Sequence, residues 1–269
     1  MTNATSFGAN AQNYKAHRPL YPGALFDWIA AEAPAHDLAW DCATGAGQAA
    51  GALATRFRRV IATDVSAEQI AVADGPPNVS FAVSPAAPAT LGDGTADAIT
   101  VATALHWFYG TPFWKECRRV GKPGAFFAAW AYKIFTLNEE SNALYLKPTL
   151  DLIDPFWASG NRLAMAGYTA EAVAFPFEVT AAPDFNETHM WPFKRIAGFA
   201  RTWSAYTPRA TGPRTRNQAA RNRGKRPACV GRCVVAGDYP HHSHRRSFKR
   251  AGLTRLRFPA FRFRAISGL

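Results

Sequence analysis

The residues of this chain whose types and spacing best suit binding chemistry are Gly45, Gly47 and Asp64. Both glycines follow an apolar run, where they let the backbone turn tightly and allow a ligand to approach closely. Asp64 comes 19 residues after Gly45, at the end of a second apolar run. A carboxylate at that position accepts hydrogen bonds from two ribose hydroxyls. The spacing therefore predicts a site for an adenosine-containing cofactor.

The glycine turn alone leaves the identity of the cofactor open. The segment Gly45–Ala50 also satisfies the G-x-G-x-x-A form of the dinucleotide fingerprint, which is a weak signal when it stands by itself. A nicotinamide-dependent oxidoreductase is therefore one alternative. A strand–turn–helix built from small residues, without any ligand, is the structural alternative.

Short apolar segments alternate with helix-compatible segments and predict the elements that position these residues. The apolar segments show no clean alternation, as expected of strands that are buried on both faces of a parallel sheet. We therefore predict a doubly wound, mostly parallel α/β fold, in which ligands bind at the carboxyl ends of the strands. The predicted strands are Leu38–Ala43, Val60–Asp64, Val79–Val83, Ala96–Thr103 and Ala125–Tyr132.

Helix start and stop signals lie around these strands. A helix is expected over Gly23–Ala33, before the first strand. Ser66 and Gln69 form a capping-box pattern after the second strand. Thr111 and Pro112 predict an N-cap and a proline at the first helical position of the helix that precedes the fifth strand.

Residues 134–207 are rich in aromatic side chains and follow a looser pattern. Helical spacing of apolar residues predicts helices over Ala143–Leu152 and Phe193–Ala205, and a late strand is expected near Phe177–Thr180. We interpret this stretch as a helical insertion over the carboxyl ends of the strands. Its aromatic side chains either line a substrate pocket or, as is more common at helical spacing, belong to the core.

Four blocks of sequence resemble class I S-adenosylmethionine-dependent methyltransferases, and among them the small-molecule enzymes of the trans-aconitate methyltransferase type. The resemblance covers residues 5–207 and rests on the joint order and spacing of the blocks, since each block alone is unspecific. It implies a Rossmann-like methyltransferase fold, S-adenosylmethionine as cofactor, and methyl transfer to a small organic acceptor, with a carboxylate as one candidate. The blocks are YKAHRPLYP (14–22), DCATGAGQAA (41–50), ATDVSAEQIAVA (62–73) and TVATALHWF (100–108), the last taken with RRVGKPG (118–124).

The resemblance also implies roles for individual residues. Arg18 would face the carboxylate of the cofactor, and Asp64 would accept the ribose hydroxyls. His106 and Trp107 would lie near the methyl group as catalytic residues, with His106 the candidate base for a hydroxyl or amine acceptor. A surface ion pair for Arg18 and a backbone carbonyl as the partner of His106 are the structural alternatives. The implied cofactor-binding residues are Tyr14, Arg18, Asp41, Ala43, Gly45, Gly47, Asp64 and Thr103, and no metal is implied.

Two departures from the family pattern concern the cofactor. Ala43 stands where a glycine is commonest in the wider superfamily, and the added methyl group is expected to be tolerated in a strand-end turn. Ala87–Pro88 stands near the position where many relatives place an acid after the third strand. Adenine recognition in this chain would therefore rest on backbone groups.

The positive charge of the chain is confined to its end. The net charge is +12, but residues 1–207 hold 15 Lys and Arg against 18 Asp and Glu, while residues 208–269 hold 16 against one. We therefore divide the chain into a methyltransferase domain, 1–207, and a basic tail, 208–269, interpreted as disordered or as a frameshifted reading of a GC-rich gene. Within the tail, Leu256–Ile266 recovers alternation and is expected as an edge strand beside the fifth strand.

The tail has two further interpretations, both disfavoured. Its clustered arginines could bind nucleic acid electrostatically, although the acidic body lacks a matching basic stripe. Its cysteines and histidines could bind zinc, although their spacing fits no zinc module that we can argue from. The candidate zinc ligands are Cys229, Cys233, His241, His242 and His244.

Length and composition set the remaining expectations. The 269 residues, 48% of them hydrophobic, suffice for one large α/β domain with an appendage. The sequence has no apolar run of about 18 residues and no signal-peptide pattern, and its four cysteines are too few for a disulfide scaffold. We expect a cytoplasmic protein that acts on a small-molecule substrate without membrane contact. The oligomeric state is not indicated.

Overall fold

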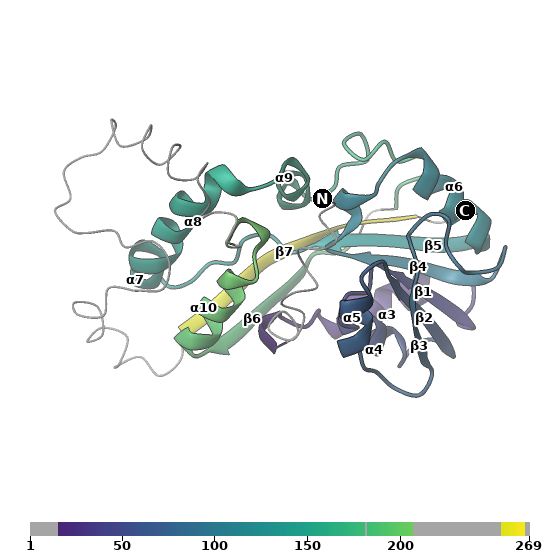
Figure 1. Ribbon diagram of the computed structural model, residues 1–269, viewed down its shortest axis with the longest axis horizontal. Helices are drawn as coiled ribbons and strands as arrows, with labels where there is room; N and C mark the ends of the chain where they lie inside the picture. The colour runs from purple at the N-terminus through teal and green to yellow at the C-terminus, as the bar shows by residue number, and fades with distance from the viewer. Residues whose placement is uncertain (1–15, 181, 207–253, 267–269) are drawn as a thin grey trace. The chain divides into compact units, whose positions relative to one another are not determined.

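The structure is a computed structural model that describes residues 16–180 and 182–206, together with the backbone of residues 254–266 (Figure 1). The chain divides into two compact units. The first unit comprises the described residues within Met1–Thr136, Ser159–Thr188 and Arg257–Leu269, and the second those within Leu137–Ala158 and His189–Leu256. The candidate site residues that the structure describes all belong to the first unit.

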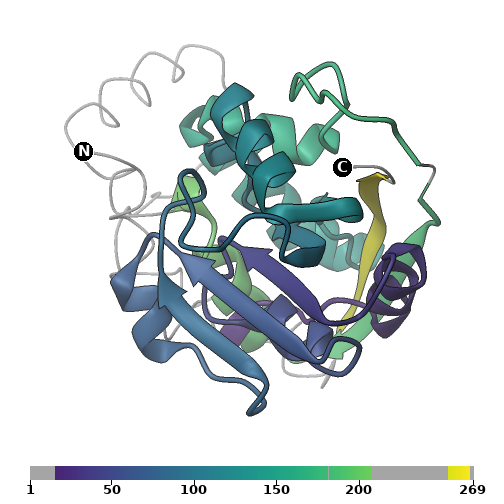
Figure 2. The ribbon, with the colours of Figure 1, turned by 90° about the vertical axis from the view of Figure 1, so that its right-hand side faces the viewer.

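The first unit is built on a parallel sheet. Five strands pair in parallel in the order β3-β2-β1-β4-β5, and Figure 2 shows the purple and blue strands at the start of the chain running side by side. The predicted doubly wound, mostly parallel α/β fold is confirmed. The strands are β1 (Leu38–Cys42), β2 (Arg59–Asp64), β3 (Val79–Val83), β4 (Ala96–Ala102) and β5 (Gly121–Ala131).

The fifth strand begins earlier than its sequence predicts. Gly121, Pro123 and Gly124 indicate a turn, so the strand was expected to begin at Ala125. In the structure Gly121 pairs with Ala96 of β4, and the register then shifts at an irregularity in the ladder. The glycines and proline are accommodated at this irregularity, where they do not interrupt the strand.

Helices cover both faces of the sheet because alternate residues of each strand point to opposite sides. On β5, Phe126, Ala128 and Trp130 belong to one buried cluster, which includes α3 (Gly23–Glu32) and α4 (Gln48–Leu53). The intervening residues Phe127, Ala129 and Ala131 belong to a second cluster, which includes α6 (Thr111–Val120) and α9 (Ser159–Ala166). Burial on both faces explains why β1, apart from Asp41, and the second part of β5 from Ala125 onward are apolar.

The helix start signals are confirmed in part. The Ser66 hydroxyl accepts a hydrogen bond from the Gln69 N–H and caps α5 (Ala67–Val72). The helix α6 begins at Thr111, so Gly110 occupies the N-cap position and Pro112 the second helical position. The expected cap at Thr111 is therefore one residue too late, because Gly110, with φ of 128°, makes the turn into the helix.

Helices occupy parts of both predicted ranges, Ala143–Leu152 and Phe193–Ala205, but the late strand is misplaced. The expected strand near Phe177–Thr180 is wrong, and β6 spans Phe185–Trp191 instead. The interior face of β6 includes Glu187 and His189, and these polar residues obscured the apolar alternation. The remaining elements are α7 (Glu139–Ser141), a π-helical turn (Asn142–Leu146), α8 (Lys147–Ile153), short 3₁₀ turns (Asp154–Phe156 and Ser204–Tyr206) and α10 (Phe193–Arg201).

Aromatic side chains of the second unit pack against one another. The rings of Tyr145 and Phe193 meet edge to face with centroids 4.8 Å apart, and those of Trp157 and Trp203 lie 6.0 Å apart. These rings therefore belong to the core of the unit, which is the more common of the two expectations for aromatic residues at helical spacing.

The strand expected over Leu256–Ile266 is confirmed as β7 (Thr254–Ile266). It pairs antiparallel with β5, from Ile266 opposite Phe127 to Arg262 opposite Ala131. It is not an edge strand, because the sheet continues from β7 to β6. The expected disorder of residues 208–250, the frameshift interpretation and the candidate zinc ligands lie outside the described residues, and the domain boundary at residue 207 stays a prediction.

Candidate cofactor-binding site

The candidate residues gather where the strand order reverses. The chain passes from β1 outward to β2 and β3, and then returns to place β4 on the other side of β1. The segments that follow β1 and β4 consequently diverge at the carboxyl edge of the sheet, and this switch point is where open α/β sheets bind their ligands. Gly45 and Gly47 follow β1, Asp64 ends β2, and His106 follows β4.

The carboxylate of Asp64 holds the glycine turn directly. The Gly45 N–H donates to Oδ2 of Asp64 at 2.9 Å, and the Ser66 N–H donates to Oδ1 at 2.9 Å. Burial raises the pKa of Asp64, and the hydrogen bonds from these backbone groups act against that rise. Each carboxylate oxygen has a second lone pair, so both can still accept a ribose hydroxyl.

The two glycines differ in how strictly their positions require the absence of a side chain. Gly47 has a φ of 91°, and an added Cβ would lie 3.0 Å from the ring of Phe81, so packing and backbone both demand glycine. Gly45 has a φ of 58°, but the nearest atom to an added Cβ is 3.9 Å away, in the side chain of Gln69. An added Cβ at Gly45 would therefore make an ordinary van der Waals contact, and it is the left-handed backbone that favours glycine there.

Asp41 supports the turn from inside the protein. Its side chain is fully buried, Oδ2 accepts from the Thr44 hydroxyl at 2.6 Å, and Oδ1 accepts from the Thr100 hydroxyl at 2.9 Å. Burial raises the pKa of Asp41 to about 6, and the two hydroxyl donors oppose this rise. Asp41 therefore positions the loop through Thr44. Ala43, which precedes Thr44, has a φ of 57°, in the left-handed region that favours glycine.

The segment before α3 packs on the end of β5. The Tyr21 hydroxyl lies 3.2 Å from the hydroxyl of Thr103, and the Tyr21 ring stacks on Tyr132 with centroids 6.3 Å apart. The Arg18 guanidinium carbon lies 5.3 Å from the centre of the same Tyr132 ring, in a cation–π contact. Tyr14 lies outside the described residues. Sequence reasoning missed Tyr21, although it belongs to the block YKAHRPLYP that carried Arg18.

His106 is buried on the short 3₁₀ turn Leu105–Trp107 that follows β4. Its Nδ1 atom lies 2.7 Å from the Tyr168 hydroxyl, and its ring centroid lies 4.5 Å from that of Trp107. Among the residues that the structure describes, no hydrogen-bond partner faces Nε2 of His106, and burial lowers the pKa of the imidazole to about 4. His106 is thus held neutral, and its buried Nε2 atom makes no hydrogen bond to the described residues.

Tyr168 is the second residue that sequence reasoning did not assign to the site. It follows Gly167, and the two have φ values of 47° and 88°, both in the left-handed region. This conformation ends α9 and turns the phenol toward His106, while Gly160 of α9 packs so closely that an added Cβ would lie 3.0 Å from the His106 carbonyl oxygen. The Gly167–Tyr168 pair was the available sequence signal for this turn.

Residues 16–180 and 182–206 contain no group of three or more His, Cys, Asp and Glu side chains placed to hold a metal ion. In that same part of the chain no helix has the length and apolar character needed to cross a membrane.

Comparison with known proteins identifies the class. The methyltransferase-domain family matches residues 40–129. A protein of Dictyostelium discoideum assigned to the methyltransferases is 30% identical over 204 residues, which are 74% of this chain and 77% of the relative. An uncharacterized methyltransferase of Mycobacterium tuberculosis is 32% identical over 120 residues, or 44% of this chain and 49% of that relative.

A solved structure extends the likeness to nearly the whole chain. A protein of Anaeromyxobacter dehalogenans described as a type II methyltransferase is 31% identical, covers 93% of this chain and 97% of its own, and superposes with a TM-score of 0.71. The fold and site therefore define a Rossmann-like methyltransferase. The chain belongs to the class I S-adenosylmethionine-dependent methyltransferases, and S-adenosylmethionine is its cofactor.

Proposed function

We propose that this enzyme transfers the methyl group of S-adenosylmethionine to a small organic acceptor, in the manner of the trans-aconitate methyltransferase type. The observation that carries the proposal is the contact between Asp64 and the Gly45 N–H at the switch point of the sheet. In this proposal the Asp64 carboxylate accepts the ribose hydroxyls beside a glycine turn in which an added Cβ at Gly45 would clash with nothing. An adenosine-containing group fits these residues.

The cofactor, when bound, supplies a methyl group that is already activated by the positive charge on sulfur. The residues of the chain then have to orient the acceptor in line with the methyl group and exclude water. In this proposal Asp64 binds the ribose hydroxyls, the turn from Ala43 to Gly47 approaches the cofactor through its backbone, and Arg18 binds the cofactor carboxylate.

The chemistry of the acceptor decides whether His106 is needed as a base. A carboxylate acceptor is already ionised at neutral pH and needs no base. A hydroxyl or amine acceptor must lose a proton. The Nε2 atom of the neutral His106, which has no hydrogen-bond partner among the described residues, lies on a turn at the switch point. We propose Nε2 as the proton acceptor for acceptors of that kind, with Trp107 beside the same ring as a wall of the site.

The proposal is tested by product analysis. The enzyme is incubated with S-adenosylmethionine carrying a deuterated methyl group and with pooled small carboxylic acids, alcohols and amines. The labelled products are then identified by mass spectrometry. Transfer of the label to a small acid, alcohol or amine supports the proposal. Label that appears only on protein or RNA added in parallel would contradict the small-acceptor assignment.

A further inference from the structure

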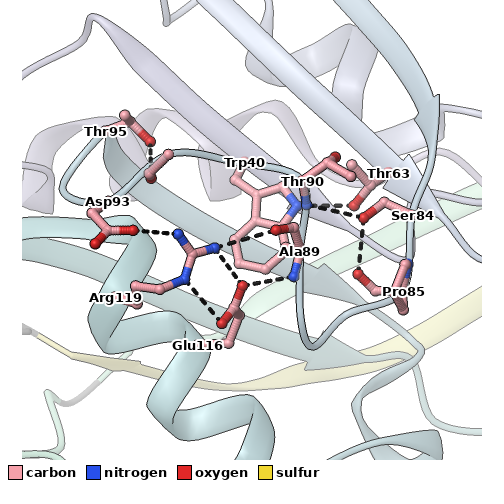
Figure 3. Close-up of polar contacts among 11 residues, drawn as sticks. Trp40, Thr63, Ser84, Pro85, Ala89, Thr90, Asp93, Thr95, Glu116 and Arg119 are labelled. Carbon is pink, nitrogen blue, oxygen red and sulfur yellow. Dashed lines mark hydrogen bonds and ion pairs between the residues drawn. The ribbon is translucent and has the colours of Figure 1, made fainter.

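The loop between β3 and β4 is held in place by the helix α6. The Ala89 N–H donates to Oε1 of Glu116 at 2.6 Å, and the Ala89 carbonyl accepts from Nη2 of Arg119 at 3.2 Å. Arg119 also binds both Glu116 and Asp93, and Figure 3 shows its guanidinium between these two carboxylates. One residue of the loop thus has both of its backbone polar groups fixed by a pair of side chains one helical turn apart.

A serine closes the same loop from its other end. The Ser84 N–H donates to the Asp64 carbonyl at 2.9 Å, which ties the start of the loop to the end of β2. The Ser84 hydroxyl accepts from the Thr90 N–H at 3.2 Å and donates to the Pro85 carbonyl at 3.1 Å (Figure 3). Both ends of the segment between Ser84 and Thr90 are therefore fixed next to Asp64.

The middle of the loop has unused backbone groups. Within the described residues, neither Ala86 nor Ala87 uses its N–H in a hydrogen bond, although both residues are half-buried. Asp64 lies opposite Val83 in the ladder between β2 and β3, so a base attached to a ribose held by Asp64 reaches the loop that follows β3. Adenine offers an acceptor at N1 and a donor at N6, which a backbone N–H and a backbone carbonyl can pair.

We propose that Glu116 and Arg119 are positioning residues for cofactor selectivity, acting through Ala89 to hold the Ala86–Ala87 backbone against the adenine edge. The inference rests on the proposed cofactor geometry at Asp64 and extends it to residues of α6 that do not touch the cofactor. A fixed backbone pair distinguishes adenine from hypoxanthine, because hypoxanthine reverses donor and acceptor on that edge and leaves the backbone groups unpaired. A loop released from α6 loses this distinction.

The experiment compares two ligands on matched variants by calorimetry. The ligands are S-adenosylhomocysteine and S-inosylhomocysteine, which differ only in the base. The variants are Glu116→Ala, which removes the acceptor of the Ala89 N–H, Glu116→Gln, which restores a neutral acceptor, and Arg119→Met. Lys115→Ala, an exposed position on the same helix, is the control. Melting temperatures confirm that each variant is folded.

The expected result is a loss of affinity for S-adenosylhomocysteine that the inosine analogue does not share. The unmodified enzyme prefers S-adenosylhomocysteine at least 30-fold over the inosine analogue, on the order of a mismatched polar pair. Glu116→Ala and Arg119→Met weaken the binding of S-adenosylhomocysteine about tenfold and leave the affinity for the analogue almost unchanged. Glu116→Gln recovers most of the preference for S-adenosylhomocysteine, and Lys115→Ala retains it.

Three outcomes would overturn the inference. Equal weakening of both ligands would make the Glu116–Arg119 pair purely structural, and unchanged binding in folded variants would remove it from cofactor recognition. If the unmodified enzyme binds neither ligand, the cofactor geometry at Asp64 fails first. If it binds S-adenosylhomocysteine and the variants do so equally well, only the role of α6 fails.

Discussion

Nδ1 of His106 and the hydroxyl of Tyr168 lie 2.7 Å apart, while Nε2 on the opposite side of the ring has no hydrogen-bond partner among the described residues. A buried N–H without an acceptor is rarer in proteins than an under-used acceptor. The contact therefore favours the tautomer in which Nδ1 carries the proton and donates to Tyr168. That tautomer leaves a lone pair on Nε2, as a proton acceptor requires.

The tautomer can be observed directly. We expect long-range ¹H–¹⁵N correlation spectra of the protein at pH 7 to show His106 protonated at Nδ1 only. In Tyr168→Phe, which removes the partner of Nδ1, we expect a mixture of the two neutral tautomers. Protonation of His106 at Nε2 in the unmodified protein would show that Tyr168 donates to the ring, and it would remove His106 as a base.

Burial of His106 also predicts a pH dependence of stability. The folded protein keeps the His106 pKa at about 4, whereas the unfolded chain binds a proton near pH 6.5. The unfolded state therefore gains protons first as the pH falls, and stability decreases from about pH 6.5 to pH 4. The full difference is about 3 kcal/mol, at about 1.36 kcal/mol for each pKa unit.

The contribution of His106 is isolated by subtraction. Asp41 acts in the opposite direction, because its raised pKa of about 6 makes the folded state bind a proton first as the pH falls from 6 toward 3.8. The comparison is therefore made between the unmodified protein and His106→Asn, by urea denaturation at several pH values. A difference between the two that does not change between pH 7 and pH 4 would contradict the buried neutral state of His106.

The sequence predicts the fold of the first unit well because the central strands of its sheet, β1, β4 and β5, are buried on both faces. Four of the five parallel strands are predicted to within a residue at each end, because parallel strands appear as compact apolar runs between helix caps; β3, at the edge of the sheet, is predicted equally well although none of its residues is fully buried. The early start of β5 and the position of β6 escaped prediction for physical reasons. A register irregularity accommodates Gly121, and Glu187 and His189 on the interior face of β6 break its apolar alternation.

The candidate site was predictable where it depends on local backbone. The glycine turn and Asp64 lie in one strand–turn–helix–strand unit, so their spacing in the sequence predicts their contact. The hydrogen bond between His106 and Tyr168 and the one from the Ala89 N–H to Glu116 join residues 62 and 27 positions apart. Such contacts depend on how α9 and α6 pack on the sheet, which a single sequence does not specify.

Ala43 offers a test of strain in the cofactor turn. An alanine with a φ of 57° is strained by about 1–2 kcal/mol relative to the right-handed conformation, and glycine escapes this strain while it adds about 0.5–1 kcal/mol of unfolded-chain entropy. We expect Ala43→Gly to raise the free energy of unfolding by about 0.5–1 kcal/mol and to retain binding of S-adenosylhomocysteine. Destabilisation measured in urea would contradict the left-handed conformation at Ala43.

Tyr21 tests the attachment of the N-terminal segment to the sheet. Tyr21→Phe removes the hydroxyl that lies 3.2 Å from Thr103 and keeps the ring contacts with Tyr132 and Trp130. We expect a loss of about 1 kcal/mol in the free energy of unfolding, the usual net value of such a hydrogen bond. Tyr109→Phe, at an exposed tyrosine, is the control and should leave stability unchanged.

The contact between Asp64 and the glycine turn is tested most directly by calorimetric titration of S-adenosylhomocysteine. We expect the unmodified protein to bind this ligand and not NAD. Asp64→Ala should weaken binding by about 1.5–3 kcal/mol, or roughly 10- to 150-fold, because it removes a charged acceptor to which both the ribose hydroxyls and the turn donate hydrogen bonds. Asp27→Ala, which removes an exposed carboxylate paired with Arg56, should bind as the unmodified protein does. Binding of NAD in place of S-adenosylhomocysteine, or equal affinity in Asp64→Ala, would contradict the account.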